Sequence, residues 1–320
     1  MRPQVVVLGD ANVDMVIRLP DRTATGDLRG SEPRLFGGGS AANVAVGLAR
    51  LGMGVAFIGS VGDDGYGRWV RDDLAREGID TRGLVEARDA FTPMVIALIQ
   101  PDGERLVVVW PPERGADLRL RPEDVEAAWP TGAAWLHTSG MCLRASPIKE
   151  AVLHGMGLAR EASATVSLDL NLRLELWGLD RETRTTLERA VASSDVVLGS
   201  GPEEIAPLAG VEDVEAAAGA LSDGVRTVVA RLGADGALAV TPQGIFRAPA
   251  FPPGLPGQTP LLVDTLGAGD AFDAGFIAAR LAGQHVAEAL RWGNAVSALK
   301  IGRPGARGTP TWDELAALLE

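Results

Sequence analysis

The chain has 320 residues and 46% apolar content, which is enough to bury the core of a large α/β domain with a small appendage. Its formal net charge is −12 and its basic residues are scattered, so no nucleic-acid partner is expected. One cysteine, Cys142, excludes an internal disulfide, and we find no export signal or membrane-length apolar run, so a cytoplasmic protein with no membrane partner is expected.

The first predicted strand covers residues 5–9, a short apolar run typical of a buried parallel strand. It continues into Asp10-Ala11-Asn12-Val13-Asp14 and not into the Gly-X-Gly-X-X-Gly turn of dinucleotide-binding folds, which argues against a dehydrogenase. Asn12 and Asp14 thus lie near the end of a strand, where polar side chains either bind a ligand or form a turn.

Two strand-like segments, 15–36 and 92–110, are not followed by helices in the alternating order seen elsewhere. The second contains a turn signal at 101–103, Pro-Asp-Gly. We predict that these segments form the hairpins of a small accessory sheet. The main α/β domain then consists of three pieces, residues 1–14, 37–91 and 111–320.

Strands and helices alternate through most of the remaining chain. Helices are predicted from Ser40 to Gly52 and from Gly67 to Glu77. Further strands are predicted at 55–59, 134–138, 164–169, 196–199 and 227–230. This order predicts a mostly parallel central sheet flanked by helices, with ligands bound at the carboxyl ends of the strands.

Near the C-terminus, residues 262–276 (LVDTLGAGDAFDAGF) predict a loop of small residues that leads into a helix. Backbone N–H groups at such a helix start, beside Gly267, Ala268 and Gly269, form a site for a phosphoryl group. Asp270 would either cap the helix or act as a general base toward an attacking alcohol. Local chemistry alone does not choose between these roles.

Residues 264–272 (DTLGAGDAF) resemble the C-terminal signature of the PfkB, or ribokinase-like, family of carbohydrate kinases. Residues 37–45 (GGGSAANVA) resemble its N-terminal signature, in the expected order and distance. The resemblance implies a ribokinase-like α/β fold in which the small sheet is a β lid over the sugar, with Gly37-Gly38-Gly39 as its hinge and as a close backbone approach to the substrate. It also implies an ATP- and magnesium-dependent phosphotransferase with an alcohol acceptor. Asp270 would be its base, and the amides of 267–269 would contact the phosphoryl group.

The resemblance also implies substrate-binding residues. Sugar contacts would come from Asn12, Asp14, Gly38, Gly39 and Asn43. The stretch Asp169-Leu-Asn-Leu-Arg173, followed by Leu176-Trp177, is similar to the D-x-N-x-R…LW stretch of the fructokinase and 2-keto-3-deoxygluconate kinase branches. Arg173 would then approach phosphate or substrate, the alternative being a surface ion pair.

A nucleotide site is implied by two further matches. The turn 231–236, which contains Arg231, Gly233 and Gly236, resembles the turn that lines the nucleotide in this family, and it also fits a plain hairpin turn. Asn294 lies where a helix walls the adenine pocket of the family.

Metal binding is less regular. The family's N-x-x-E motif for magnesium is altered here. In one alignment Glu204 takes the place of the motif's Glu and Gly201 that of its Asn; in an alternative register these places are taken by Glu203 and Ser200. Residues 303–306 resemble the loop that, with the backbone and side chain near Asp264, holds a monovalent cation such as potassium in some members of the family. The resemblance implies Asp264, Gly305 and Thr309 as the residues of such a site.

The acceptor predicted from the resemblance is a neutral ketose such as fructose. Residues 115–117 resemble part of a fructokinase segment, and the lid has Val108, Val109 and Trp110 where ketodeoxygluconate kinases place Tyr and Arg. A sugar acid would therefore lack a charge partner. Ribose, 2-keto-3-deoxygluconate or a nucleoside stay as alternatives, as does a non-catalytic sugar-binding protein. An exposed lid sheet also predicts a homodimer through the lid.

Overall fold

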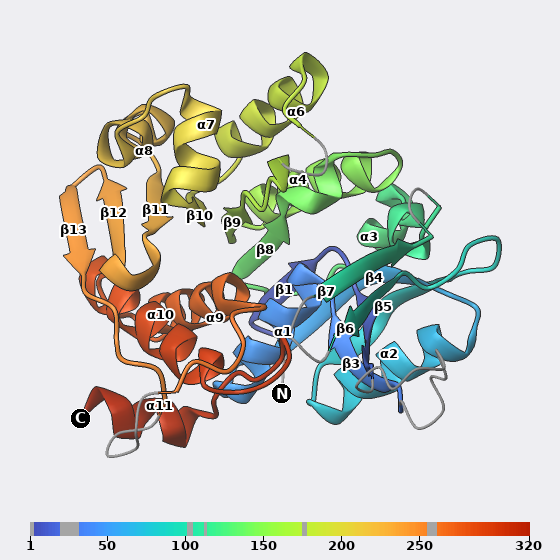
Figure 1. Ribbon diagram of the computed structural model, residues 1–320. Helices are drawn as coiled ribbons and strands as arrows, with labels where there is room; N and C mark the ends of the chain where they lie inside the picture. Colours follow the sequence, from blue (N-terminus) through green and yellow to red (C-terminus); the bar gives the residue numbers. More distant parts are fainter. Residues whose placement is uncertain (1–2, 20–31, 101–104, 112–113, 175–177, 255–260) are drawn as a thin grey trace.

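The computed structural model describes residues 3–19, 32–100, 105–111, 114–174, 178–254 and 261–320 (Figure 1). Within this part of the chain, the larger sheet has nine strands. They are β1 (Val5–Leu8), β4 (Val55–Gly62), β5 (Asp80–Ala87), β8 (Trp135–Ser139), β9 (Thr165–Asp169), β10 (Val196–Ser200), β11 (Thr227–Arg231), β12 (Ala237–Thr241) and β13 (Gly244–Ala248). Their order is β13-β12-β11-β10-β9-β8-β1-β4-β5.

Every neighbouring pair from β5 to β11 is parallel, and β12 and β13 are added antiparallel at one edge. The predicted mostly parallel sheet is confirmed. Three strands were not predicted from the sequence: β5 and β13 are the two edge strands, and β12 lies next to β13. Edge strands combine buried and exposed positions, as in the burial of β5, and so lack the continuous apolar run that marks a central strand.

Helices cover both faces because alternate side chains of the parallel strands enter two separate cores. Val5 and Val7 of β1 enter one core, and Val6 and Leu8 enter the other. The first core is covered by α1 (Ser40–Arg50), α2 (Gly65–Arg76), α9 (Ala268–Leu281), α10 (Val286–Ile301) and α11 (Trp312–Leu319). The second is covered by α3 (Pro122–Ala128), α4 (Ile148–Glu161), α6 (Arg181–Ala192), α7 (Ala206–Ala209) and α8 (Val214–Ser222).

A separate four-stranded sheet, which we call the lid, is built from β2 (Asn12–Arg18), β3 (Arg34–Gly38), β6 (Met94–Ile99) and β7 (Arg105–Trp110). Its order is β3-β2-β6-β7, and β2 and β6 pair in parallel. The predicted small sheet is confirmed. Its strands β2 and β3 reach further than the segment 15–36, because Asn12 pairs with Gly38. The predicted turn at 101–103 lies outside the described residues.

Helix α9 positions the site. Its residues from Ala271 to Ala279 are buried, and it packs between α1 and α10 (Figure 1). Asp273, in its first turns, is ion-paired to Arg231 at the end of β11. The N-terminus of α9 is thereby held beside the carboxyl edge of the sheet, where ligands bind in open parallel sheets. Among the described residues, no helix is both long and apolar enough to cross a bilayer.

Candidate active site

Two cavities meet at the first turn of α9. The first, of about 310 Å³, lies between the carboxyl edge of the large sheet and the lid. Of the predicted site residues, it is lined by Asn12, Asp14, Gly39, Asn43, Arg173, Gly267 and Asp270. The second, of about 370 Å³, is lined by Arg231, Gly233, Gly236, Ala268, Gly269 and Asn294. One helical turn thus borders both cavities.

The other predicted residues do not line these cavities. They are Gly38, Glu204, Asp264, Gly305 and Thr309. Gly38 lies directly behind Asp14, where an added Cβ atom would come within 2.4 Å of Asp14 Oδ1 and 2.6 Å of Asn12 Nδ2. A glycine at this position therefore leaves space for the two polar side chains of the first cavity.

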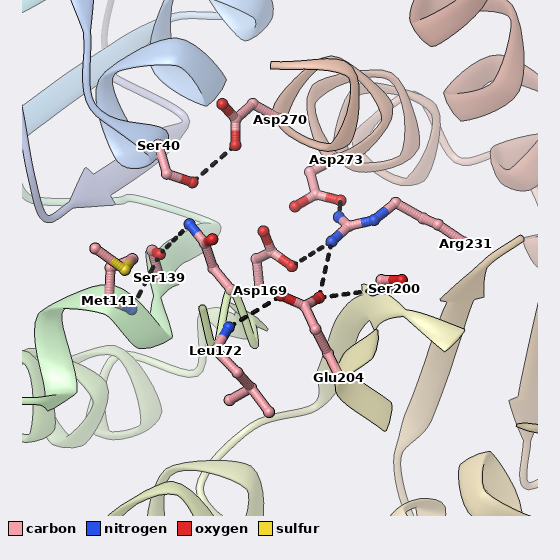
Figure 2. A network of polar contacts seen from close by, with 11 residues as sticks. Ser40, Ser139, Met141, Asp169, Leu172, Ser200, Glu204, Arg231, Asp270 and Asp273 are labelled. Carbon is pink, nitrogen blue, oxygen red and sulfur yellow. Dashed lines mark hydrogen bonds and ion pairs between the residues drawn. The ribbon is translucent and has the colours of Figure 1, made fainter. Parts of the chain in front are cut away.

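Asp270 is held by α1 and does not cap its own helix. Ser40 Oγ donates to Asp270 Oδ1 at 2.7 Å (Figure 2), and Asn43 Nδ2 donates to Asp270 Oδ2 at 2.8 Å. The cap position of α9 is Gly267, with a left-handed φ of 75°. Burial raises the pKa of Asp270 to about 6, although the hydrogen bonds from Asn43 and Ser40 lower it. At neutral pH the carboxylate is therefore ionised and still basic enough to accept a proton.

Arg307 fixes the orientation of Asn43. Its Nε donates to Asn43 Oδ1 at 3.2 Å, its Nη2 donates to the carbonyl of Gly38 at 2.9 Å, and its Nη1 pairs with Asp73. Because the Asn43 oxygen accepts from Arg307, its NH₂ group must face Asp270. Sequence reasoning missed Arg307, which lies 264 positions from Asn43 in a loop, and it also missed the contact of Ser40.

The three polar residues that follow β1, Asp10, Asn12 and Asp14, have two separate roles. Asp10 accepts from the backbone N–H groups of Ser40 at 2.8 Å and Ala41 at 3.2 Å, so it satisfies the start of α1. Asn12 Nδ2 donates to Asp14 Oδ1 at 2.7 Å, inside the first cavity. Burial raises the pKa of Asp14 to about 6, against the effects of Asn12 and Arg307.

Arg231 is the centre of a buried ion-pair cluster (Figure 2). Its Nη2 lies 2.8 Å from Asp169 and 3.4 Å from Glu204, and its Nη1 lies 2.6 Å from Asp273. Burial alone would lower the pKa of Arg231, but Asp169, Asp273 and Glu204 hold it well above the usual value. Arg231 borders the second cavity, yet its charge is matched within the protein.

Glu204 is engaged by the backbone. It lies in a turn of π-helix, Gly201–Ile205, that follows β10. Its Oε1 accepts from the N–H of Leu172 at 2.9 Å, and its Oε2 accepts from that of Ser200 at 2.6 Å. Ser200 and Glu203 line the second cavity instead. The predicted pair Leu176-Trp177 lies outside the described residues.

Of the predicted monovalent-cation residues, Asp264 and Gly305 contact each other, and Thr309 contacts a side chain of α1. Gly305 N–H donates to Asp264 Oδ2 at 3.0 Å. The main-chain oxygen of Asp264 accepts from Lys300 Nζ at 2.7 Å, and that of Thr309 accepts from Arg50 Nη1 at 3.1 Å. Charged side chains therefore already contact two of the three predicted ligands.

Comparison with known proteins gives consistent matches along the whole chain. The family described as pfkB family carbohydrate kinase matches residues 2–313. The ATP-dependent ribose-1-phosphate kinase of Halopiger xanaduensis is 36% identical over 319 residues, covering 99% of this chain and 98% of that protein. The fructokinase of Klebsiella pneumoniae is 36% identical over 286 residues, covering 87% of this chain and 84% of that protein. The crystal structure of Vibrio cholerae O395 fructokinase with fructose, ADP and calcium superposes with a TM-score of 0.81 at 31% identity, covering 99% of each chain.

Proposed function

The chain belongs to the pfkB family of carbohydrate kinases, and from this premise we propose that it transfers the γ-phosphoryl group of ATP to a hydroxyl of a small neutral sugar, with fructose as the best acceptor. The family, the ribokinase-like fold and the class of enzyme, a phosphotransferase with an alcohol acceptor, are confirmed. The identity of the sugar is the part that we propose here.

The observation that supports this proposal is the position of the α9 N-terminus between two cavities. Asp270 and Gly267 border the cavity that contains Asn12 and Asp14, whereas Gly269 borders the other. A sugar hydroxyl on one side and a nucleotide phosphate on the other would therefore meet at a single helix start, where an anion is stabilised.

In the proposed reaction, Asp270 takes the proton of the sugar hydroxyl while the oxygen attacks the γ-phosphorus of ATP. The bond from phosphorus to the leaving oxygen of ADP breaks, and the proton stays on Asp270. Because the Ala268 N–H already donates to the carbonyl of Thr265 at 3.1 Å, we assign contact with the transferring phosphoryl group to the amides of Gly267 and Gly269.

ATP would occupy the second cavity. Gly233 and Gly236 border it without side chains, and Asn294 is held in its wall by hydrogen bonds to the carbonyls of Ala248 at 3.0 Å and Pro249 at 2.9 Å. Magnesium, which offsets the charge of the phosphates when bound, would lie near Ser200 and Glu203, since both Glu204 oxygens accept backbone N–H groups. This favours the second register of the altered motif. Arg173, from the first cavity, would contact phosphate.

The charges of the first cavity favour a neutral acceptor. Asp10, Asp14 and Asp270 line it, and a fourth carboxylate, Asp117, pairs with Arg144 at 3.8 Å. Asp14 can accept hydrogen bonds from sugar hydroxyls, whereas an acid substrate would be repelled by the carboxylates of Asp10, Asp14 and Asp270. A second candidate is a sugar phosphate such as ribose 1-phosphate, since Arg144 and Arg173 both line the cavity and a relative with this substrate matches nearly the whole chain.

The experiment that tests the function is coupled ADP release across a panel of acceptors. The panel contains fructose, ribose, ribose 1-phosphate, 2-keto-3-deoxygluconate, adenosine and inosine. We expect the highest kcat/KM with fructose. A higher value with ribose 1-phosphate would select the second candidate, and no turnover with any acceptor, together with measurable sugar binding, would favour a non-catalytic sugar-binding protein.

The activity is expected to fall as the pH drops below about 6, because Asp270 must be ionised to accept a proton and burial raises its pKa to about 6. Asn43→Ala removes a hydrogen-bond donor to the ionised form, so the pKa of Asp270 should rise and the acid limb should move to higher pH. The measurement is kcat/KM against pH for both proteins. If the acid limb does not move in Asn43→Ala, the loss of activity at low pH does not arise from protonation of Asp270.

We also propose that two copies pair through the lid. Strand β7 lies at the edge of this sheet and exposes five consecutive apolar side chains, from Leu106 to Trp110, each 43–58% exposed. An exposed apolar edge strand is a template for pairing with a second chain. We expect light scattering after size exclusion to give a dimer, and Val108→Lys to give a monomer. The matched control is Val225→Lys, at a 70% exposed site elsewhere, and a monomeric wild-type protein would contradict the proposal.

A further inference from the structure

Lys300 is an unusual basic residue in this protein. The chain has 30 lysines and arginines, of which only Lys149 and Lys300 are lysines. Lys300 lies in the last turn of α10 and is fully buried, with 0% exposure. Its Nζ donates to the main-chain oxygen of Asp264 at 2.7 Å. Burying an ammonium group is costly unless it is compensated, so this position calls for a specific role.

The surroundings of Lys300 do not fit an additional metal cation. The carbonyl of Asp264 accepts from the ammonium, and its carboxylate oxygens accept from the N–H groups of Leu266 and Gly305, each at 3.0 Å. The carbonyl of Thr309 accepts from Arg50. The oxygens predicted to bind potassium are therefore supplied with hydrogen-bond donors from the protein, two of which are cationic.

The contacts also connect Lys300 to the start of α9. Asp264 precedes Gly267 by three residues, and the N–H groups of Val263 and Asp264 donate to the carbonyl of Ile301 at 2.8 and 3.1 Å. Gly267 packs closely on the loop after α10, because an added Cβ would come within 2.7 Å of the carbonyl of Ala306. The loop that leads into the phosphoryl-binding turn is thus fastened to the end of α10.

We propose that the ammonium of Lys300 serves as a built-in monovalent cation, which orders the loop from Asp264 to Gly267 and makes the enzyme independent of potassium. This role rests on the proposed kinase function. Lys300 lines neither of the two cavities, so it is a positioning residue. A compact ammonium with several donors is close to a potassium ion in how it binds carbonyl oxygens.

The first test needs no variant. The kcat of the wild-type enzyme is measured in a tetramethylammonium buffer and again with potassium or sodium added. We expect the rates to agree within about twofold, and a rise of about tenfold with potassium, equal to 1.4 kcal/mol, would overturn the proposal. If no acceptor is phosphorylated in any buffer, the kinase proposal fails, and the melting temperatures below still report on Lys300.

The second test uses Lys300→Ala and Lys300→Met, with Lys149→Met as the control because Lys149 pairs with Glu182 at the surface. We expect kcat to fall by about tenfold or more in both Lys300 variants, as when one stabilising group is lost, with little change in the KM for sugar. Potassium or methylammonium should restore part of the rate in Lys300→Ala. Potassium should also raise the melting temperature of Lys300→Ala but not that of the wild type. Equal responses of the two proteins to potassium would contradict the proposal.

Discussion

The Asp270→Asn variant is expected to phosphorylate its sugar about 10²–10⁴-fold more slowly than the wild type, because an amide cannot accept the proton of the attacking hydroxyl. The fold and the affinity for sugar should be retained. Asparagine has nearly the same shape: its oxygen can accept from Asn43 Nδ2, and its NH₂ group can donate to Ser40 Oγ, because a hydroxyl accepts as well as donates. The measurements are kcat from coupled ADP release and the sugar dissociation constant from calorimetry.

The matched control for Asp270→Asn is Asp313→Asn. Asp313 is also an acid in the first turn of a helix, α11, but it is exposed and lies outside both cavities. We expect its kcat to be unchanged. Near-normal turnover in Asp270→Asn would remove this carboxylate from the role of general base, whereas loss of sugar binding in parallel with turnover would point to a binding role.

The Arg231→Met variant is expected to lose about 3–5 kcal/mol of unfolding free energy, since it removes one partner from a buried ion-pair cluster. Asp169, Glu204 and Asp273 would be left in the interior without their shared counter-charge. Methionine keeps much of the volume of the side chain, so the loss would arise mainly from charge. The measurement is the midpoint and slope of urea unfolding at pH 7.

The pH dependence of this loss has a defined sign. Burial already raises the pKa of Asp273 well above its usual value and raises that of Glu204, and Arg231 counteracts both shifts. Without Arg231, both pKa values should rise further, so protonation relieves the charge and the stability deficit should shrink as the pH falls. A carboxyl whose pKa is higher in the folded state than in the unfolded state stabilises the fold only in its neutral form.

The control for Arg231→Met is Arg247→Met, which breaks an exposed ion pair with Glu215 and should cost about 0–1 kcal/mol. If the two variants had the same stability, the cluster would not be the anchor of α9 that the structure indicates. If Arg231→Met instead kept its stability and raised the KM for ATP, Arg231 would act in nucleotide binding, as the sequence resemblance implied.

The sequence by itself determined the features that depend only on residues close together in the chain. The loop and helix at 262–276 and the alternation of apolar runs with helical segments each depend on residues close together in the chain. These local patterns were sufficient to predict the mostly parallel sheet, the separate small sheet and the position of Asp270 at the start of a helix. The edge strands β5 and β13 were missed, because their apolar pattern is interrupted at exposed positions.

Only the tertiary structure decided which groups hold the site together. Ser40 meets Asp270 across 230 positions, and Arg307 meets Asn43 across 264. A lone polar residue in a loop has no periodicity, so nothing in its neighbours reveals its distant partner. The structure also distinguishes two neighbouring glutamates: Glu204 is buried and accepts two backbone N–H groups, whereas Glu203 lines the second cavity. The same physical reason applies to Lys300, since the need to satisfy a buried charge depends on what surrounds it in space and not on what precedes it in the chain.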